Sequence, residues 1–305
     1  IVVSPEVGSL REWPQSRWVE LVQAAQAQIL SSIKSSDCEA FLLSESSLFV
    51  WKDRITMITC GCTTLIKAAE KFISWVSSEN IQACIYERKN EYHPHLQKSN
   101  VFEDFEDLQK LGDFECFRYG NADEHHLYIA NMLKPYEPSQ GDTTLELLMY
   151  DLAPEVQQVL GTPNQKIEKV REMISVEGVF PDFVVDDFLF EPYGYSLNAL
   201  KGECYYTIHV TPQEEGSYVS FETNFPEKED YAHLVQEVIK RFQPRTFDVV
   251  TFTETDLPMQ DFEGFINLNT TTGSIQSGYG VTYSSFVKPH RNINKPFSIQ
   301  SRELL

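Results

Sequence analysis

A short polar turn carries the residues that could act on the chain itself. Residues 44–47 (SESS) lie between two apolar runs, 40–43 and 48–51, that are typical of short β-strands. Such a turn holds a serine hydroxyl beside a backbone carbonyl, and an internal acyl shift between Ser46 and Glu45 needs those two groups. The plainer interpretation is an ordinary turn, because serine favours turns through hydrogen bonds to the backbone.

A second candidate is His209, which lies in the β-like run 205–211 (YYTIHVT). Alternation along a strand places its odd-numbered residues, which are polar or aromatic, on one face and its even-numbered residues on the other. His209 therefore belongs to a polar stripe. Taken alone, a strand histidine is more often a structural residue than a catalytic one.

Acidic residues mark a third candidate. Asp142, Thr144 and Glu146 share one face of a predicted strand whose other face is mostly apolar. Two acids four residues apart on that face could hold an ammonium group. An exposed polar face explains the same pattern equally well.

Many short strands and few helices must position these residues. Apolar residues at helical spacing predict helices over 16–34, 63–77, 105–111, 167–174 and 231–242. β-rich runs predict strands within 40–51, 55–59, 83–87, 117–119, 126–130, 143–149, 183–188, 205–211, 217–223, 247–252 and 280–286. This pattern indicates an α+β protein with antiparallel sheets. Residues 135–142 (PYEPSQGD) are the best candidate for a joint between two halves.

Composition limits the partners of the chain. Its formal charge is −20, with 25 basic and 45 acidic residues, which argues against nucleic acid as a partner. The charge suits cationic ligands, although an acidic surface for solubility is the plainer reason. No apolar run is long enough to cross a membrane, and no signal peptide is legible, so we expect a cytoplasmic protein without a membrane partner.

The six cysteines, at positions 38, 60, 62, 84, 116 and 204, are scattered. They form neither a CxxC pair nor a Cys/His cluster at zinc spacing, so we expect free thiols and no metal. Cys60 alone would be interpreted as a buried apolar residue at a strand end.

Four motifs, in this order along the chain, favour the chemical interpretations over the plainer ones. They are the segment 42–50 (LLSESSLFV), Thr59-Cys60-Gly61, Gly194-Tyr195-Ser196-Leu197-Asn198, and residues 206–224 (YTIHVTPQEEGSYVSFETN). Together they resemble the eukaryotic-type S-adenosylmethionine decarboxylases, from about Gly8 to past Asn224. The resemblance implies a four-layer α/β/β/α sandwich, in which two antiparallel sheets pack face to face with helices outside.

The resemblance also implies self-processing of a proenzyme, or zymogen. One domain, 1–305, would be cut between Glu45 and Ser46 into 1–45 (the β chain) and 46–305 (the α chain), and Ser46 would become a pyruvoyl group. His209 is the implied base, Ser196 steers the ester intermediate, and Cys60 is the implied proton donor. The pyruvoyl carbonyl would form a Schiff base with the substrate, so neither pyridoxal phosphate nor a metal is expected.

The implied reaction is carried out by a lyase that decarboxylates S-adenosylmethionine and supplies the aminopropyl donor for spermidine and spermine synthesis. Phe190 matches one of two phenylalanines that hold adenine, and the other belongs to an N-terminal strand that precedes Gly8 in the family. A trimmed, disordered or incompletely predicted N-terminus explains the absence of that strand better than a real loss. Leu43 and Glu45 are further implied substrate contacts. Gln213 stands where the family has a ribose-binding glutamate, and an amide forms that hydrogen bond without charge assistance.

In some relatives, the equivalents of Asp142, Thr144, Glu146 and Glu222 bind putrescine, which promotes processing and activity. Ile58, where a lysine is common, weakens the link between such a site and the active site. If residues 212–216 form the hairpin loop, His209 faces Val219 and Glu222 points to the opposite side of the sheet. Both monomers and homodimers occur in the family.

Two other functions remain open. One is an inactive regulatory paralogue that binds and activates a competent decarboxylase subunit; Gln213 favours it, and the joint presence of Ser46, Cys60, Ser196 and His209 argues against it. The other is a Ser-His or Cys-His hydrolase, for which the sequence offers no GxSxG nucleophile turn.

Overall fold

The computed structural model describes residues 1–61, 63–91, 94–161, 163, 165–175, 180–211, 217–225, 231–254 and 261–289. Within them, residues 1–132 build one sheet layer and residues 144–287 build the other. The joint predicted at 135–142 is the segment that crosses from the first layer to the second.

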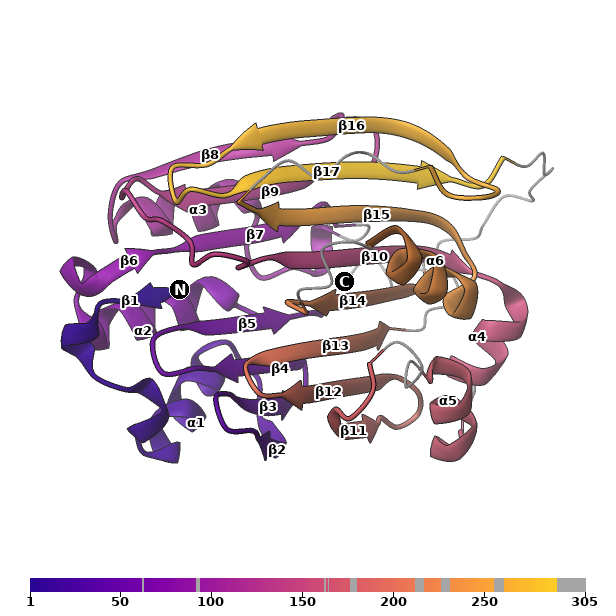
Figure 1. Ribbon diagram of the computed structural model, residues 1–305, viewed down its shortest axis with the longest axis horizontal. Coiled ribbons are helices and arrows are strands. Elements are labelled where there is room, and N and C mark those ends of the chain that lie inside the picture. The colour runs from indigo at the N-terminus through magenta and orange to yellow at the C-terminus, as the bar shows by residue number, and fades with distance from the viewer. Residues whose placement is uncertain are drawn as a thin grey trace.

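The second layer is one antiparallel sheet of eight strands (Figure 1). Its order is β11 (Val184–Leu189), β12 (Tyr195–Lys201), β13 (Cys204–Thr211), β14 (Tyr218–Thr223), β10 (Thr144–Leu152), β15 (Pro244–Thr253), β17 (Gly280–Val287) and β16 (Ile266–Ser274). The three strands that carry predicted site residues, β12, β13 and β14, are therefore neighbours, and β10 lies next to them.

The first layer consists of three antiparallel pieces. They are β2 (Ile29–Lys34), β3 (Glu39–Leu43), β4 (Ser46–Val50) and β5 (Ile55–Thr59); β1 (Val2–Val3) with β6 (Ile81–Ala83); and β7 (Ile85–Lys89), β9 (Leu127–Met132) and β8 (Phe114–Tyr119). β3 packs against β12 of the large sheet. All five residues of β3 and of β4 are buried, because the other sheet covers one face and helices cover the other.

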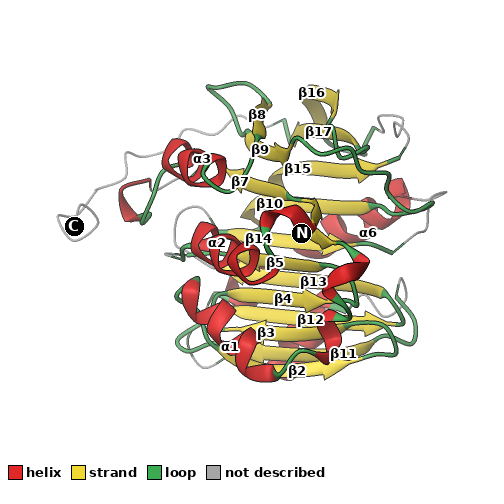
Figure 2. Cartoon of the chain, turned by 90° about the vertical axis from the view of Figure 1, so that its left-hand side faces the viewer, coloured by secondary structure: helices red, strands yellow, loops and turns green. Residues whose placement is uncertain are grey.

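Helices close the two outer faces (Figure 2). The first layer is covered by α1 (Gln15–Ala24), α2 (Leu65–Val76) and α3 (Val101–Gln109), and the large sheet by α4 (Pro154–Leu160), α5 (Ile167–Ile174) and α6 (Tyr231–Phe242). Short 3-10 turns lie at Pro5–Val7, Leu10–Glu12, Ser78–Asn80 and Pro94–Leu96. This arrangement confirms the four-layer sandwich.

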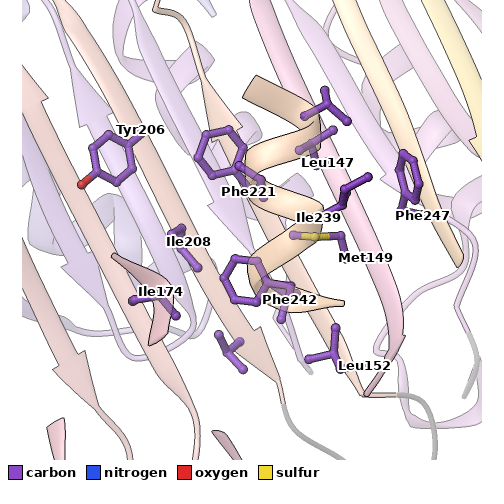
Figure 3. Close-up of a cluster of buried hydrophobic side chains, with 14 of the residues drawn as sticks. Leu147, Met149, Leu152, Ile174, Tyr206, Ile208, Phe221, Ile239, Phe242 and Phe247 are labelled. Carbon is purple, nitrogen blue, oxygen red and sulfur yellow. The ribbon is translucent and has the colours of Figure 1, made fainter. Parts of the chain in front are cut away.

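Each helical layer shares an apolar core with its sheet. Figure 3 shows the larger core, where Phe221 and Ile208 of the sheet meet Ile239 and Phe242 of α6. On the other side, Phe72 of α2 packs against the buried faces of β3 and β4. The side chains on the outward face of each sheet lie in these cores, and the side chains on the inward faces of the two sheets contact each other.

The helix expected over 16–34 is wrong in its second half. α1 ends at Ala24, and Gln26 has a positive φ of 64°. The following residues, ILSSIK, form β2, in which half-buried and exposed residues alternate. This period of two is that of a strand, and the pairing of β2 with β3 overrides the helical interpretation. β12, β16 and α4 lie outside the strands and helices predicted from the sequence.

Candidate active site

The Glu45–Ser46 peptide closes the hairpin between β3 and β4. Leu43 pairs with Ser46, so Ser44 and Glu45 form the two-residue connection. Ser46 also pairs with Thr59 of β5, so strands hold it on both sides. Its φ is 125°, a region that side-chain-bearing residues rarely adopt and that costs of order 1–3 kcal/mol. The backbone is therefore strained at the bond that the sequence singles out.

The hydroxyl of Ser46 and the carbonyl of Glu45 are the two groups that an acyl shift at this peptide would need. The Ser46 hydroxyl is buried and has no hydrogen-bond partner among the residues described. The carbonyl oxygen of Glu45 accepts a hydrogen bond of 3.1 Å from the backbone N–H of Cys60. That donor lies where negative charge would develop if a nucleophile attacked the carbonyl carbon.

Cys60 follows β5 and is fixed beside Glu45 by Gly61. Gly61 has a positive φ of 64°, and a Cβ there would lie 2.8 Å from Oε2 of Glu45. Burial, and then the neighbouring Glu45 carboxylate, raise the pKa of the Cys60 thiol to about 12. The thiol is therefore protonated at neutral pH, as a proton donor must be.

Neutral groups surround the ring of His209. Nδ1 lies 3.0 Å from the Ser196 hydroxyl, and Nε2 lies 2.8 Å from the Thr207 hydroxyl and 3.2 Å from the Ser47 hydroxyl. Ser196 and His209 are directly paired across β12 and β13. Burial lowers the pKa of His209 to about 3, so the imidazole is neutral and basic at physiological pH.

Three residues of this network were missed by the sequence interpretation: Ser47, Asn198 and Thr207. Asn198 accepts a hydrogen bond of 2.6 Å from Ser47 and one of 3.0 Å from Thr207. Asn198 lies two residues after Ser196, and Thr207 two residues before His209, on the same strand faces. That spacing is the signal that could have found them.

A cavity of about 580 Å³ lies between the two layers, and Ser46, Cys60 and Thr211 line it. The predicted acidic residues Asp142, Glu146 and Glu222, together with Thr144, line the same cavity. The structure therefore places Ser46 and Cys60 in the same interior space as the predicted diamine site, whereas Ser196 and His209 are not among the residues that line it.

The acidic end of this cavity contains three half-buried carboxyl groups. Glu146 is paired with Glu222 across β10 and β14, and Glu87 of β7 approaches from the opposite layer. Burial raises the pKa of Glu87 to about 7 against the opposing effect of its hydrogen bond with Glu146, and burial followed by Glu146 raises that of Glu222 to about 8. Burial and Glu87 hold the pKa of Glu146 well above its usual value. Glu87 was missed because the ERK run resembles ordinary surface charge.

Two of the acids, Asp142 and Glu222, already have hydrogen-bond or ion-pair partners. Asp142 accepts a hydrogen bond of 2.8 Å from Tyr279 and forms an ion pair of 3.4 Å with Arg54. Glu222 accepts a hydrogen bond from the Tyr205 hydroxyl. Arg54 offsets the charge of Asp142, so Glu87, Glu146 and Glu222 are the carboxyl groups whose charge these contacts do not offset.

The expected position of Glu222 on the opposite face of the sheet from His209 is wrong. His209 pairs with Ser220, and Thr207 pairs with Glu222, so both functional side chains face the other layer. Thr211 pairs with Tyr218, and Ser217 instead bonds to the end of β10 through its carbonyl and hydroxyl groups. One extra residue in the connection reverses every facing direction along β14.

The remaining predicted contacts are placed as follows. Phe190 follows β11, and its N–H donates to the Gly194 carbonyl at 2.9 Å. The Leu43 side chain is buried in the core under α1 and α2, so only its backbone remains for a ligand. Gln213 lies outside the described residues. Ile58 packs at the edge of a cluster between the layers that includes Phe49 and Tyr205.

Across the described part of the chain, no group of three or more His, Cys, Asp or Glu side chains could hold a metal ion. Of the helices described, none has the length and apolar character to cross a membrane. Cys38, Cys60, Cys84, Cys116 and Cys204 are free thiols.

Comparison with known proteins gives consistent results. The family model described as "Adenosylmethionine decarboxylase" matches residues 2–287. The S-adenosylmethionine decarboxylase proenzyme of Xenopus laevis is 33% identical over 300 residues, which are 92% of this chain and 89% of that protein. The proenzyme of Drosophila melanogaster is 34% identical over 266 residues, covering 80% and 76% of the two chains.

A solved structure gives the same result for the fold. The crystal structure of the AdoMetDC-delta26 monomer of Trypanosoma brucei aligns with a TM-score of 0.62 and 26% identity. The alignment covers 80% of this chain and 99% of that one.

Proposed function

Because this chain belongs to the adenosylmethionine decarboxylase family, we propose that it decarboxylates S-adenosylmethionine after cutting itself between Glu45 and Ser46. The product is the aminopropyl donor for spermidine and spermine synthesis. The chain is thus a proenzyme, cut into residues 1–45 and 46–305.

The observation that supports self-cleavage most directly is the geometry of the Glu45–Ser46 peptide. A strained, buried serine with an unpartnered hydroxyl follows a carbonyl that already accepts a hydrogen bond from the Cys60 N–H. An ordinary hairpin turn requires neither the strain nor the unpartnered hydroxyl, and each costs free energy.

The proposed cleavage begins when the Ser46 hydroxyl attacks the Glu45 carbonyl carbon. The Cys60 N–H stabilises the negative oxygen, and the C–N bond breaks to leave an ester and a free amine on residue 46. His209 then takes the proton from Cα of residue 46. The bond between Cβ of residue 46 and the ester oxygen breaks, and the backbone carboxylate of Glu45 leaves. The resulting enamine becomes an imine, and hydrolysis consumes water and releases ammonia, giving a pyruvoyl group at position 46.

A pyruvoyl group at this position would supply a carbonyl that binds the substrate amine and withdraws electrons as carbon dioxide leaves. The role of Cys60 is to return a proton to the substrate carbon, for which its thiol is protonated at neutral pH. Ser196 and His209, in contact at 3.0 Å, serve the earlier processing steps. Phe190, the Leu43 backbone, Glu45 and Gln213 are the proposed substrate contacts.

The acidic end is the proposed putrescine site. Glu146 and Glu222, with Asp142 and Thr144, line it from the large sheet, and Glu87 adds a carboxyl group from the first layer. A dication compensates the repulsion among half-buried carboxylates, which otherwise retain protons. A cytoplasmic location, which free cysteines suit, completes the proposal.

The experiment that tests this function is the intact mass of the purified full-length chain under denaturing conditions. Two fragments, one ending at Glu45 and one starting with a pyruvoyl group, would support the proposal. Inactivation by borohydride with substrate present would then separate a pyruvoyl enzyme from a hydrolase. A chain that stays whole, with or without putrescine, would contradict the proposal and favour the regulatory paralogue.

A further inference from the structure

Asn198 is placed to control the proton on His209. Its side-chain oxygen is a shared acceptor for the hydroxyl groups of Ser47, at 2.6 Å, and Thr207, at 3.0 Å. The Thr207 hydroxyl has a second acceptor, the Leu197 carbonyl oxygen, at 2.8 Å. Both hydroxyl protons are therefore directed toward carbonyl oxygens and away from the imidazole.

This arrangement decides which nitrogen of His209 carries hydrogen. The oxygens of Ser47 and Thr207 present lone pairs to Nε2, so Nε2 must be the donor. A neutral imidazole has one N–H group, which leaves the lone pair on Nδ1. Nδ1 faces Ser196, whose hydroxyl donates to it at 3.0 Å.

Burial makes this control effective. Ser47 and Asn198 are fully buried, and Thr207 is 1% exposed, so bulk water does not compete for these hydrogen bonds. The Asn198 amide nitrogen is itself buried without a partner among the described residues. A buried amide nitrogen without a partner is rare in proteins. In this orientation of the Asn198 amide, the oxygen accepts hydrogen bonds from two hydroxyl groups.

We propose that Asn198 is a positioning residue for self-cleavage, which holds His209 in the Nε2–H form and so makes Nδ1, on the Ser196 side, the basic atom. The part of this inference that concerns cleavage rests on the proposed function. The part that concerns the tautomer does not.

The consequence falls on the elimination step. Nδ1 takes the Cα proton of residue 46, and the electron pair of that bond forms the Cα–Cβ double bond. The bond between Cβ and the ester oxygen then breaks, and the backbone carboxylate of Glu45 leaves. If Nδ1 carried hydrogen instead, it would have no lone pair for that proton. The ester would still form, and it would accumulate.

The direct test is the ¹⁵N NMR spectrum of the histidine rings in the full-length Ser46→Ala protein, which cannot cut itself. The His209 signals are assigned by comparison with Ser46→Ala combined with His209→Gln. We expect an unprotonated Nδ1 and a protonated Nε2 at neutral pH. The reverse pattern would mean that the Asn198 amide nitrogen faces the hydroxyl groups, and it would overturn the assignment.

The functional test compares Asn198→Leu with Asn131→Leu, a control that alters a fully buried asparagine of β9. We expect Asn198→Leu to cut at least tenfold more slowly and to accumulate an ester that hydroxylamine cleaves between residues 45 and 46. Asn198→Asp keeps the acceptor oxygen and should restore part of the rate. Asn131→Leu should cut as the unaltered chain does.

Cleavage of Asn198→Leu at the unaltered rate, or an uncut chain in which hydroxylamine finds no ester, would contradict the assigned step. Melting temperatures show whether each variant folds, and the NMR result stands even if Asn198→Leu does not. An unaltered chain that never cuts would refute the proposed function and leave the tautomer measurement intact.

Discussion

The space between the two layers buries polar groups in opposite ways at its two ends. At one end, the hydroxyls around His209, its imidazole with a lowered pKa and the Cys60 thiol with a raised pKa are neutral at physiological pH, and the Glu45 carboxyl group lies beside Cys60. At the other end, Glu87 and Glu146 lie close together. Burial raises the pKa of both carboxyl groups, so they keep protons that carboxyl groups usually lose.

The difference shows what each end is suited to do. Neutral groups carry little desolvation cost when buried, and a medium of low polarity strengthens the hydrogen bonds that hold them in place. Clustered carboxyl groups instead leave an electrostatic cost that only protons or a cation can offset. The first end is suited to chemistry on uncharged groups, and the second is suited to binding a cation.

Ser46→Ala should have the largest effect, because it removes the nucleophile at the neutral end. We expect a chain that stays whole and has no decarboxylase activity, measured by intact mass and by carbon dioxide release. Ser44→Ala is the matched control, since Ser44 lies in the same hairpin connection and its hydroxyl accepts a hydrogen bond from the Gln28 N–H. A Ser46→Ala chain that is still cut would show that position 46 is not the nucleophile.

Cys60→Ala should separate processing from decarboxylation. The backbone N–H that bonds to Glu45 is retained, so we expect cleavage to proceed. Loss of the proton donor should lower the rate of correct product formation by about 10²–10⁴, the usual range for general acid catalysis. Product analysis by mass spectrometry measures this, with Cys116→Ala, an exposed thiol, as the control. An unchanged product rate would refute the assigned role.

Glu146→Gln should affect the acidic end alone. It removes one carboxyl group from the cluster, so we expect putrescine affinity to fall at least about tenfold, since a hydrogen bond to a charged group is worth about 1.5–3 kcal/mol. Calorimetric titration measures this, and Glu115→Gln, on an exposed position of β8, is the control. Equal putrescine binding by the two variants would contradict a diamine site there.

Putrescine binding should depend on pH with a definite sign. Glu87 and Glu222, with pKa values of about 7 and 8, must release protons before they can pair with a dication. Affinity should therefore rise as pH increases from 6 to 8, with proton release on binding. Titrations in buffers of different ionisation enthalpy measure the released protons, and an affinity that is independent of pH would count against the acidic cluster as the site.

Stability without a ligand should show the smallest effect, with opposite slopes from the two ends. The lowered pKa of His209 means that the unfolded chain binds more protons, so its contribution to stability is lost as pH falls from about 6.5 toward 3. The raised pKa values of Glu87 and Glu222 mean that the folded chain binds more protons, so their contribution is lost as pH rises from about 4.5 to 8. Each group contributes at most about 1.4 kcal/mol per pH unit.

Urea unfolding of the Ser46→Ala chain across this pH range measures both slopes. Adding His209→Gln should flatten the acidic side, and adding Glu222→Gln should flatten the alkaline side. If either substitution flattened the other side, the division of the cavity into two ends would be wrong.

The local patterns predicted faces well. Alternation along 205–211 places His209 and Thr207 on the face that meets the other layer, and Ile208 in the core under α6. This works because the side-chain period of a strand is independent of its partners. The assignment of Ser46, Cys60 and Ser196 to chemistry depended on the resemblance, because each residue alone has a plainer interpretation.

Register and distant contacts could not be predicted in the same way. The facing direction of Glu222 depends on whether Ser217 pairs with β13 or bonds to β10, which is a tertiary choice. Glu87 approaches Glu146 only because β7 and β10 belong to opposed layers. Residues 29–34 form a strand because β3 offers a partner, which a helical pattern in one segment does not reveal.

The position of β3 between β2 and β4 has a consequence for reversibility. The proposed cleavage after Glu45 would sever the connection between β3 and β4 but leave their pairing, and the buried β3 would keep residues 1–45 in place. Folding before the cut is a process of one chain, whereas refolding after it requires two chains to meet. The mature protein should therefore refold in a concentration-dependent way, and its persistence depends on how slowly the two pieces separate.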